Sequence, residues 1–416
     1  MVAASELTYT NANAMQMAEE IFGDGVTVVS ASYSGDNRSS AIYSNGDALA
    51  PGATPGDTGV ILSTGRANHY TNSNGQANQD TNTSTNTRGV NNNADFNAAA
   101  GTNTYDASFL DISFIPDSNV MTMQFVFSSE EYPEYVNSVY QDFVGVWVNG
   151  TQVNMEVGNG DTDPGNVNAT NNENLFLDNT GDAYNTEMDG LTVTMTLTMT
   201  VVPGIVNTIR IGIADVSDSN YDSSLLIAGD SIQTDLVAMS DDTTVYPTGS
   251  RTLDVLDNDI NNSGGTLTIT HINGQAVTAG SSVLLNTGQT VTLNADGTIT
   301  ILGDGDTEDF NFTYTVDNGA NSDTGIVNVS SIPCFVAGTM IATPQGDRPV
   351  ETLRPGAGSR KQSRGKGSQY PQRLTHLSPL HLAPKTLGGA RRLPANPARG
   401  ADSPPPRPLK RTEAST

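Results

Sequence analysis

The chain has 416 residues and a formal net charge of −26 at pH 7, with 45 acidic and 19 basic residues. This length allows about two or three domains. The acidic body disfavours nucleic acids and anionic membranes as partners.

The composition is typical of a secreted bacterial surface protein. The body is rich in Asn, Thr, Asp and Gly, no lysine occurs before Lys361, and the single cysteine leaves no intrachain disulfide to form. Residues 1–23 lack a charged n-region and a continuous apolar core, so we expect export by a route without an N-terminal signal peptide. Because no run of about 18 apolar residues occurs, the sequence predicts no transmembrane segment.

The N-terminal third alternates short ordered segments with polar stretches. Residues 6–22 predict a helix, since Asn11 and Asn13 can cap it and the apolar residues follow helical spacing. Strands are expected at 26–33 and 60–65, with a turn-rich segment between them. Residues 66–104 are dominated by Asn, Thr and Gln, so we expect an exposed loop that is too polar to bury.

The densest core signals lie between residues 105 and 227. Apolar residues alternate along 108–115 and 120–127, and a mostly apolar run follows at 143–148. Residues 191–201 predict one strand, with Leu, Val and Met on one face and threonine on the other. We therefore expect a sheet-rich domain over this region.

Three segments of this region resemble the bacterial choice-of-anchor L domain: FVFSSEEYPEYV at 125–136, FVGVWVNG at 143–150 and IGIADVSDSNYDSSLLI at 211–227. The resemblance covers residues 10–235. It implies a jelly-roll-like β-sandwich outside the cell and no catalysis. We assign residues 1–236 to this domain and expect an unknown surface ligand, protein or glycan, as its partner. A sugar-binding module is a further possibility that rests on the fold alone.

Residues 237–331 predict a second, smaller all-β domain. Strand signals recur every 8–12 residues, and Asn-Gly or Asp-Gly turns separate several of them. The stretches DVLDND at 254–259, LNADGTITI at 293–301 and FTYTVDNG at 312–319 resemble the Ig- and cadherin-like repeats of bacterial surface proteins. An Ig-like β-sandwich is the expected fold.

The only cysteine of the chain, Cys334, lies in the stretch PCFVAGTMIATPQGDRPVETL at 333–353. A lone cysteine is either a packed apolar group or a reactive thiol. The stretch resembles the first block of the Hint module, which inteins and hedgehog autoprocessing proteins share. The resemblance implies that Cys334 is a nucleophile that attacks the carbonyl of Pro333 and forms a thioester. Residues 340–343 and 348–353 predict two strands around a turn at 344–347.

The Hint pattern stops after Arg354-Pro355-Gly356. The family's Thr-x-x-His block is not matched, because neither His376 nor His381 stands in that spacing, and the acyl shift then lacks its acid/base partner. We therefore expect residues 332–356 to be a truncated, inactive Hint fragment that is at most self-cleaving. The alternative is an active autoprocessing protein that is cleaved after Pro333.

Residues 357–416 form a basic, Pro-rich tail that we expect to be disordered. The tail is either an out-of-frame remnant of the Hint module or a basic arm for nucleic acid or membrane. The abrupt change in lysine use and the loss of alternation favour the remnant.

Three acidic groups are candidate Ca²⁺ sites, because Ca²⁺ prefers carboxylate and carbonyl oxygens. The first comprises Glu130, Glu131, Asp215, Asp218 and Asp222, and the second comprises Asp254, Asp257 and Asp259 with Asp241 and Asp242 from the linker. Solvated loop acids and a plain turn are the alternatives. The acids at 304–309 fit an acidic loop, and none of the three groups matches an EF-hand. Neighbouring strand residues point to opposite faces, so Glu130 and Glu131 are not a glycosidase pair.

Overall fold

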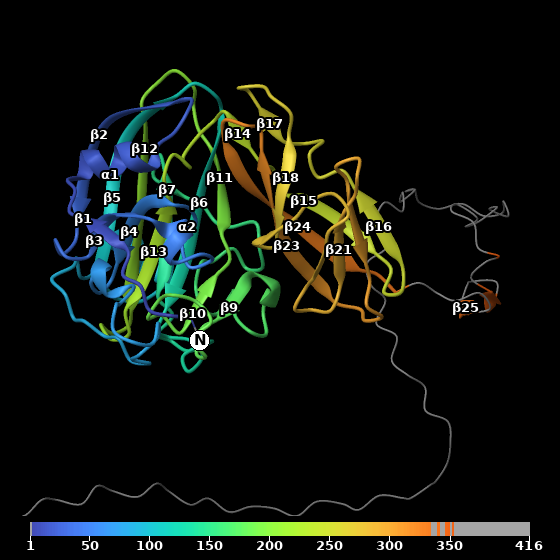
Figure 1. Ribbon diagram of the computed structural model, residues 1–416, viewed down its shortest axis with the longest axis horizontal. Helices are drawn as coiled ribbons and strands as arrows, with labels where there is room; N and C mark the ends of the chain where they lie inside the picture. Colours follow the sequence, from blue (N-terminus) through green and yellow to red (C-terminus); the bar gives the residue numbers. More distant parts are fainter. Residues whose placement is uncertain (1, 334–338, 342–345, 350–351, 353–416) are drawn as a thin grey trace, which may run out of the picture. The chain divides into compact units, whose positions relative to one another are not determined.

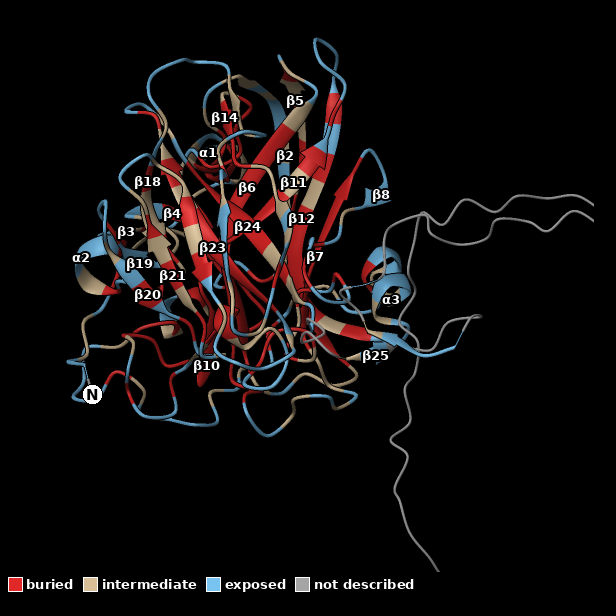
Figure 2. Ribbon diagram, turned by 90° about the vertical axis from the view of Figure 1, so that its right-hand side faces the viewer, coloured by how far each residue is buried: buried red, intermediate tan, exposed pale blue. Residues whose placement is uncertain are grey.

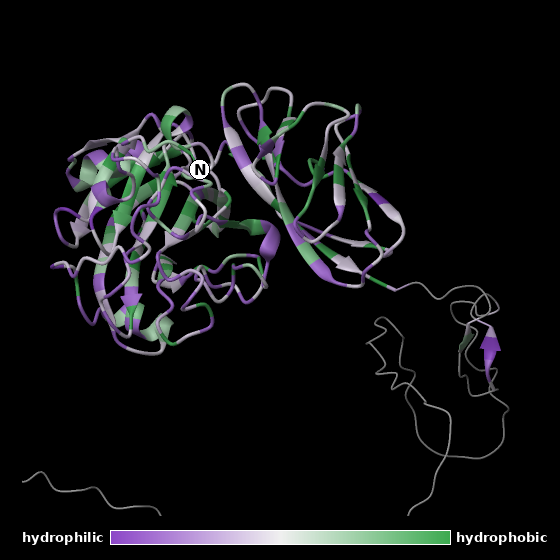
Figure 3. Cartoon of the chain, turned by 60° about the horizontal axis from the view of Figure 1, so that its bottom comes forward, coloured by the Kyte–Doolittle hydropathy of each residue, from purple (hydrophilic) through white to green (hydrophobic). Residues whose placement is uncertain are grey.

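The computed structural model describes residues 2–333, 339–341, 346–349 and 352. Strands dominate the described chain and form two β-sandwich domains, which confirms the predicted all-β class (Figure 1). Hydrophobic residues concentrate in the strands and hydrophilic residues in the connecting loops, as Figure 3 shows. This distribution follows from the two-residue period of a strand with one buried face.

Two sheets build the first domain. The larger has the order β1-β3-β4-β13-β6-β10-β9, with β11 also paired to β6, and the smaller has the order β2-β5-β12-β7-β8. The strands of the larger sheet are β1 (Thr8–Thr10), β3 (Ser40–Ser44), β4 (Thr58–Ser63), β6 (Val120–Ser129), β9 (Phe176–Asp178), β10 (Gly190–Thr192), β11 (Met195–Thr200) and β13 (Ser223–Ala228). Those of the smaller are β2 (Val26–Ser34), β5 (Thr104–Pro116), β7 (Phe143–Val148), β8 (Thr151–Gln152) and β12 (Asn207–Val216).

The main core of this domain lies between the two sheets. Alternate residues of β5 and β12, such as Ile112 and Ile211, are buried in one cluster with Phe125 and Phe127 of β6. Figure 2 shows this buried layer in red along the central strands. The opposite face of β5 and β12 points away from this core.

Helices are few and short. They are α1 (Ala14–Ile21), α2 (Gly46–Leu49) and α3 (Ala94–Ala100), with 3-10 turns η1 (Ala67–His69) and η2 (Glu173–Leu175). The helix predicted over 6–22 is therefore shorter than expected. Asn13 and Gln16 form a reciprocal capping box with two bonds of 3.0 Å, which starts α1 after Asn13. The preceding residues instead pair as β1 with β3.

The segment 66–104 is exposed over much of its length, as its composition predicted, but parts of it are buried. Tyr70, Ala77 and Phe96 are fully buried within it. Where no strand pairing is present, side-chain amides form hydrogen bonds with the backbone. Asn72 Nδ2 donates to the carbonyls of Gln76 and Ala77, both at 3.0 Å. A polar segment can thus bury single side chains when its own amides supply the hydrogen bonds.

The single strand predicted over 191–201 is divided into β10 and β11, both of which pair with β6. Its threonine face is only partly solvated, because Thr192 and Thr196 are buried while Thr200 is exposed. Thr196 Oγ1 lies 2.8 Å from Thr122 Oγ1, which donates to Asp323 of the second domain at 3.1 Å. Residues distant in sequence thus cover this face.

The second domain is an Ig-like sandwich, as predicted. Its sheets have the orders β15-β24-β23-β18-β19 and β16-β22-β21-β20, with β14 and β17 as a further pair. The strands are β14 (Leu236–Val237), β15 (Asp241–Val245), β16 (Ser250–Leu253), β17 (Ile260–Asn261), β18 (Thr268–Ile272), β19 (Gln275–Ala276), β20 (Ser282–Leu284), β21 (Thr290–Leu293), β22 (Ile299–Leu302), β23 (Asp309–Asp317) and β24 (Ser322–Ser331). β15 runs parallel to β24, and the other pairs are antiparallel.

Two short strands follow the second domain. β25 (Met340–Ile341) and β26 (Arg348–Pro349) pair antiparallel, in agreement with the two strands expected there. Cys334 lies outside the described residues, as does the tail from 353 onward. In the described part of the chain, no helix is long and apolar enough to cross a membrane.

Candidate functional site

Carboxylates gather where four strands of the first domain begin or end. β6 ends at Ser129, β7 begins after Asp142, β12 ends at Val216 and β13 begins at Ser223. The side chains concerned are all at most 4% exposed: Glu130, Glu131, Asp142, Asp215 and Asp222. We call these five residues the acidic cluster.

Glu130 is the least solvated member of the acidic cluster. It is 0% exposed, and neither carboxylate oxygen has a hydrogen-bond partner. Its backbone N–H donates to the Asp222 carbonyl at 3.2 Å, which joins the ends of the two segments. Burial raises the pKa of Glu130 to about 10, and the charge of Asp189 adds to this effect, whereas the Thr83 side chain lowers it. The side chain therefore keeps a proton at neutral pH unless a cation reaches it.

Asp142 connects Glu131 to the ends of β12 and β13. Its backbone N–H donates to Glu131 Oε2 at 2.9 Å, and its own oxygens accept from the Val216 N–H at 3.0 Å and from Ser223 Oγ at 2.7 Å. Burial, followed by the charge of Asp142, raises the pKa of Asp215 well above its ordinary value. These carboxyl groups cannot all ionise together without a compensating positive charge.

Asp222 is held on one side only. Its Oδ1 accepts from the Thr85 N–H at 2.6 Å, whereas Oδ2 has no hydrogen-bond partner. Burial raises the pKa of Asp222. A Cβ at Gly65 would lie 1.8 Å from Asp222 Oδ2, so only glycine lets this carboxylate approach the chain so closely.

The structure brings together four of the five residues predicted for the first site. Asp218 lies at the edge: it is half-buried and its Oδ1 accepts from the Asn220 N–H within the same turn, although its charge acts on Glu131 and Asp142. Sequence reasoning missed Asp142 and Asp189. Each is a single acid in the sequence, and only the tertiary fold places it beside the others.

The side chains of the acidic cluster are not arranged as a set of metal ligands. Among the described residues, no three His, Cys, Asp or Glu side chains are arranged so that they could hold a metal ion. The unpartnered oxygens instead come singly or in pairs, on Glu130, Asp215 and Asp222. A cation there would complete its coordination with carbonyl and hydroxyl oxygens, which Ca²⁺ accepts.

The second predicted site divides into a half-buried pair, Asp241 and Asp259, and a solvated turn. Asp259 Oδ1 accepts from Tyr314 Oη and from the Met239 N–H, both at 2.8 Å, while one oxygen each of Asp241 and Asp259 lacks a partner. Burial, and then the neighbouring acids, raises the pKa of Asp241 to about 7. Asp254 and Asp257 are exposed, as is Asp242.

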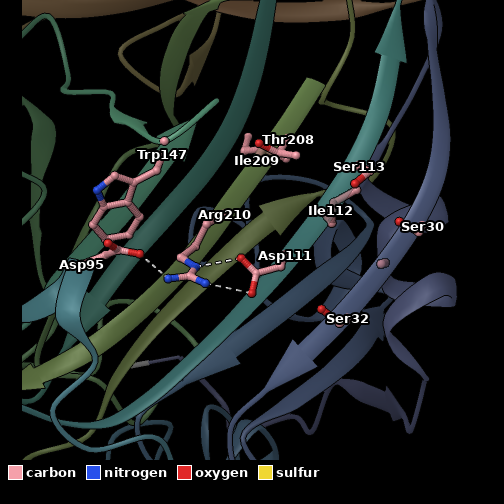
Figure 4. A pocket seen from close by; sticks show the side chains of 12 residues that line it. Ser30, Ser32, Asp95, Asp111, Ile112, Ser113, Trp147, Thr208, Ile209 and Arg210 are labelled. Atoms are coloured by element: carbon pink, nitrogen blue, oxygen red, sulfur yellow. Dashed lines mark hydrogen bonds and ion pairs between the residues drawn. The ribbon is translucent and has the colours of Figure 1, made fainter. Parts of the chain in front are cut away.

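A polar hollow lies on the outer face of the sheet β2-β5-β12-β7-β8 of the first domain. Figure 4 shows Arg210 between Asp95 and Asp111 in this hollow, with Trp147 beside them. Its volume is about 370 Å³. No motif in the sequence indicated it, because its residues come from four strands and one helix.

Three family models match the chain. The choice-of-anchor L domain matches residues 5–233, a bacterial Ig domain matches residues 233–330, and the Hint domain matches residues 333–398. No curated protein matches the chain. The matches confirm the predicted order of modules, and the Hint match continues beyond residue 356, where we expected the fragment to end.

Proposed function

This chain belongs to the choice-of-anchor L family, and we propose that its two β-domains serve a structural and adhesive role that depends on bound Ca²⁺. The order of its modules, choice-of-anchor L, Ig-like and Hint, is that of a bacterial cell-surface or extracellular protein. One observation carries the calcium part of the proposal: Glu130 is fully buried and neither of its carboxylate oxygens has a partner.

A buried carboxylate without a partner costs several kcal/mol if it is ionised. Two outcomes avoid that cost: the group keeps its proton, or a cation binds it. Ca²⁺ suits the acidic cluster because it takes about 6–8 oxygen ligands in flexible geometry, including backbone carbonyls. Asp215 and Asp222 of the acidic cluster each supply a further unpartnered carboxylate oxygen.

The second acidic group supports the same proposal in the Ig-like domain. Asp241 and Asp259 have unpartnered oxygens, and Asp241 lies within the electrostatic reach of Asp254 and Asp257. We propose that a second Ca²⁺ binds here, with the half-buried Asp241 and Asp259 as ligands.

The calcium proposal is tested by thermal unfolding of the full chain in EDTA, in excess Mg²⁺ and in increasing Ca²⁺. A ligand that binds only the folded state stabilises it by about 2.7 kcal/mol at 100 times its dissociation constant. We expect the melting temperature to rise with Ca²⁺ and to rise less with Mg²⁺, which demands stricter octahedral geometry. Identical melting curves in the three solutions would overturn the proposal.

Autoprocessing is the second candidate function, and the Hint match that begins at Pro333 favours it. We nevertheless propose that Cys334 does not cleave this chain, because neither His376 nor His381 stands in the Thr-x-x-His spacing that would supply an acid/base partner. Intact mass is measured with and without dithiothreitol or hydroxylamine, beside Cys334→Ala. A fragment ending at Pro333 that forms faster with thiol and is absent from the variant would establish autoprocessing.

A further inference from the structure

The outer face of the sheet β2-β5-β12-β7-β8 carries an open, polar hollow of about 370 Å³. Alternate residues of β5 and β12 point into the core, so Asp111 and Arg210 stand on the opposite face. Helix α3 covers one part of that face through Phe96, which packs on Phe109 and Trp147. The uncovered remainder forms the hollow (Figure 4).

Arg210 is fixed at the centre of the hollow. Its guanidinium donates to both oxygens of Asp111, at 2.8 and 3.1 Å, and also to Asp95. It lies over the Phe109 ring at 4.6 Å from the centroid. The fork is thus held in one orientation before any ligand arrives, which lowers the entropy cost of binding.

The charged groups of the hollow pair mostly with one another. Two carboxylates face one guanidinium, so an anionic ligand would meet a net negative surface on an already acidic protein. A carboxylate has about four lone-pair sites, and the bonds to Arg210 leave several of them free to accept. The hollow therefore favours a neutral ligand that donates hydrogen bonds.

Hydroxyl groups complete the lining. Ser30, Ser32, Ser113 and Thr208 line the hollow, and within the described part of the chain none of their side chains makes a hydrogen bond. Each hydroxyl can donate one hydrogen bond and accept two. An apolar ligand would leave these groups and the carboxylates without partners, at a cost in affinity.

From this lining we propose that the hollow binds a neutral glycan. A sugar presents hydroxyls that donate to the Asp95 and Asp111 carboxylates and exchange hydrogen bonds with the serine row, while its C–H groups contact the exposed 9% of Trp147. The volume lies within the range of about 300–1,000 Å³ usual for small-molecule sites. The inference rests on the adhesive part of the proposed function and names its partner class.

Trp147 allows a direct test, because it is the only tryptophan of the chain and it lines the hollow. Its fluorescence is followed while neutral oligosaccharides (of glucose, xylose and mannose) are added to the full chain. Oligogalacturonate and sulfated heparin fragments serve as anionic probes. We expect a saturable change with at least one neutral probe and none with the anionic ones.

Two variants locate the site. Ser32→Phe fills the hollow from an exposed strand position, and Arg210→Gln removes the guanidinium that holds the Asp95 and Asp111 carboxylates in place. We expect each to weaken binding at least about tenfold, equal to the loss of one strong polar contact. Thr27→Phe is the matched control, since Thr27 is exposed on the same strand and face but outside the hollow. It should change affinity by less than about twofold.

Three results would overturn the proposal: no response to any neutral probe, a response to anionic probes only, or full binding by Ser32→Phe. Melting in Ca²⁺ and EDTA is measured on the same samples. A protein that calcium stabilises but that binds no sugar would refute the glycan site and leave the calcium proposal standing.

Discussion

At the scale of single residues, the unusual feature of this protein is the number of carboxyl groups that the fold removes from water. Neither carboxylate oxygen of Glu130 has a hydrogen-bond partner, whereas Asp142 has three polar neighbours in Glu131, Val216 and Ser223. Both have a raised pKa because burial disfavours the charged form. The difference in partners marks Glu130 as the position where a cation has the most to neutralise.

Glu130→Gln separates the charge from the shape of this side chain. In EDTA at pH 8 we expect the variant to be more stable than the wild type by roughly 1–3 kcal/mol, because it needs no proton to stay buried. Adding Ca²⁺ should raise the free energy of unfolding of the variant less than that of the wild type. Urea unfolding with and without Ca²⁺ measures both effects.

Glu134→Gln is the control for this experiment, since Glu134 is exposed on the same loop. It should behave as the wild type does, because substitutions of exposed side chains usually change stability by at most about 0.5 kcal/mol. A Glu130→Gln protein that keeps the full calcium response would refute the role given to Glu130.

The acidic cluster could be predicted in part from the sequence. Glu130, Glu131 and Asp222 stand in motifs next to strong strand signals, which is why two distant loops were expected to meet. Asp142 and Asp189 could not be predicted, because nothing in their local sequence distinguishes them from solvated acids. Asp218 shows the opposite error: it belongs to the same motif, but its side chain closes its own turn.

At the scale of elements, the strands were easier to predict than the polar segments. The Ig-like domain follows its sequence signals closely, because its strands alternate and its turns contain Asn-Gly or Asp-Gly. The segment 66–104 was not predictable in the same way. Its burial depends on side-chain amides that replace backbone pairing, and composition alone cannot show which amide finds a partner.

Helix α3 gives a prediction at this scale. Phe96 is fully buried and packs on Trp147 with ring centroids 4.9 Å apart. Phe96→Ala should destabilise the protein by about 3–5 kcal/mol through the cavity it leaves. It should also shift the emission of Trp147 to longer wavelength, because water then reaches the indole.

Unfolding by urea and the emission spectrum measure these two effects. Ala98→Ser, at an exposed position of the same helix, is the control and should change stability by at most about 0.5 kcal/mol. An unchanged spectrum in Phe96→Ala would mean that α3 does not shield the indole, and would contradict the packing described here.

At the scale of the whole molecule, buried acids occur in both β-domains. Burial raises the pKa of Asp323, on β24, to about 8, although the Ala238 N–H donates to it at 2.8 Å. It raises those of Asp259 to about 6 and Asp241 to about 7 in the same domain. The free energy of unfolding therefore depends on pH through several buried acids and not through a single site.

The direction of the pKa shifts determines whether stability rises or falls with pH. An acid whose pKa is raised on folding holds its proton in the folded state after the unfolded chain has lost it, so its contribution is complete below the unfolded value near 4. The contribution is then lost as pH rises through the folded values, here about 6 to about 10. We expect the urea midpoint in EDTA to fall steadily from pH 5 to pH 9.

Calcium should remove most of this pH dependence, because a bound cation takes the place of the protons and favours the ionised carboxylates. The urea midpoint in saturating Ca²⁺ is therefore expected to be nearly constant between pH 6 and pH 9, and the two curves to converge near pH 5, where protons compete with the cation. A midpoint in EDTA that rises with pH would show that these carboxyl groups ionise freely in the folded protein. In that case neither protons nor Ca²⁺ would be needed at the acidic cluster.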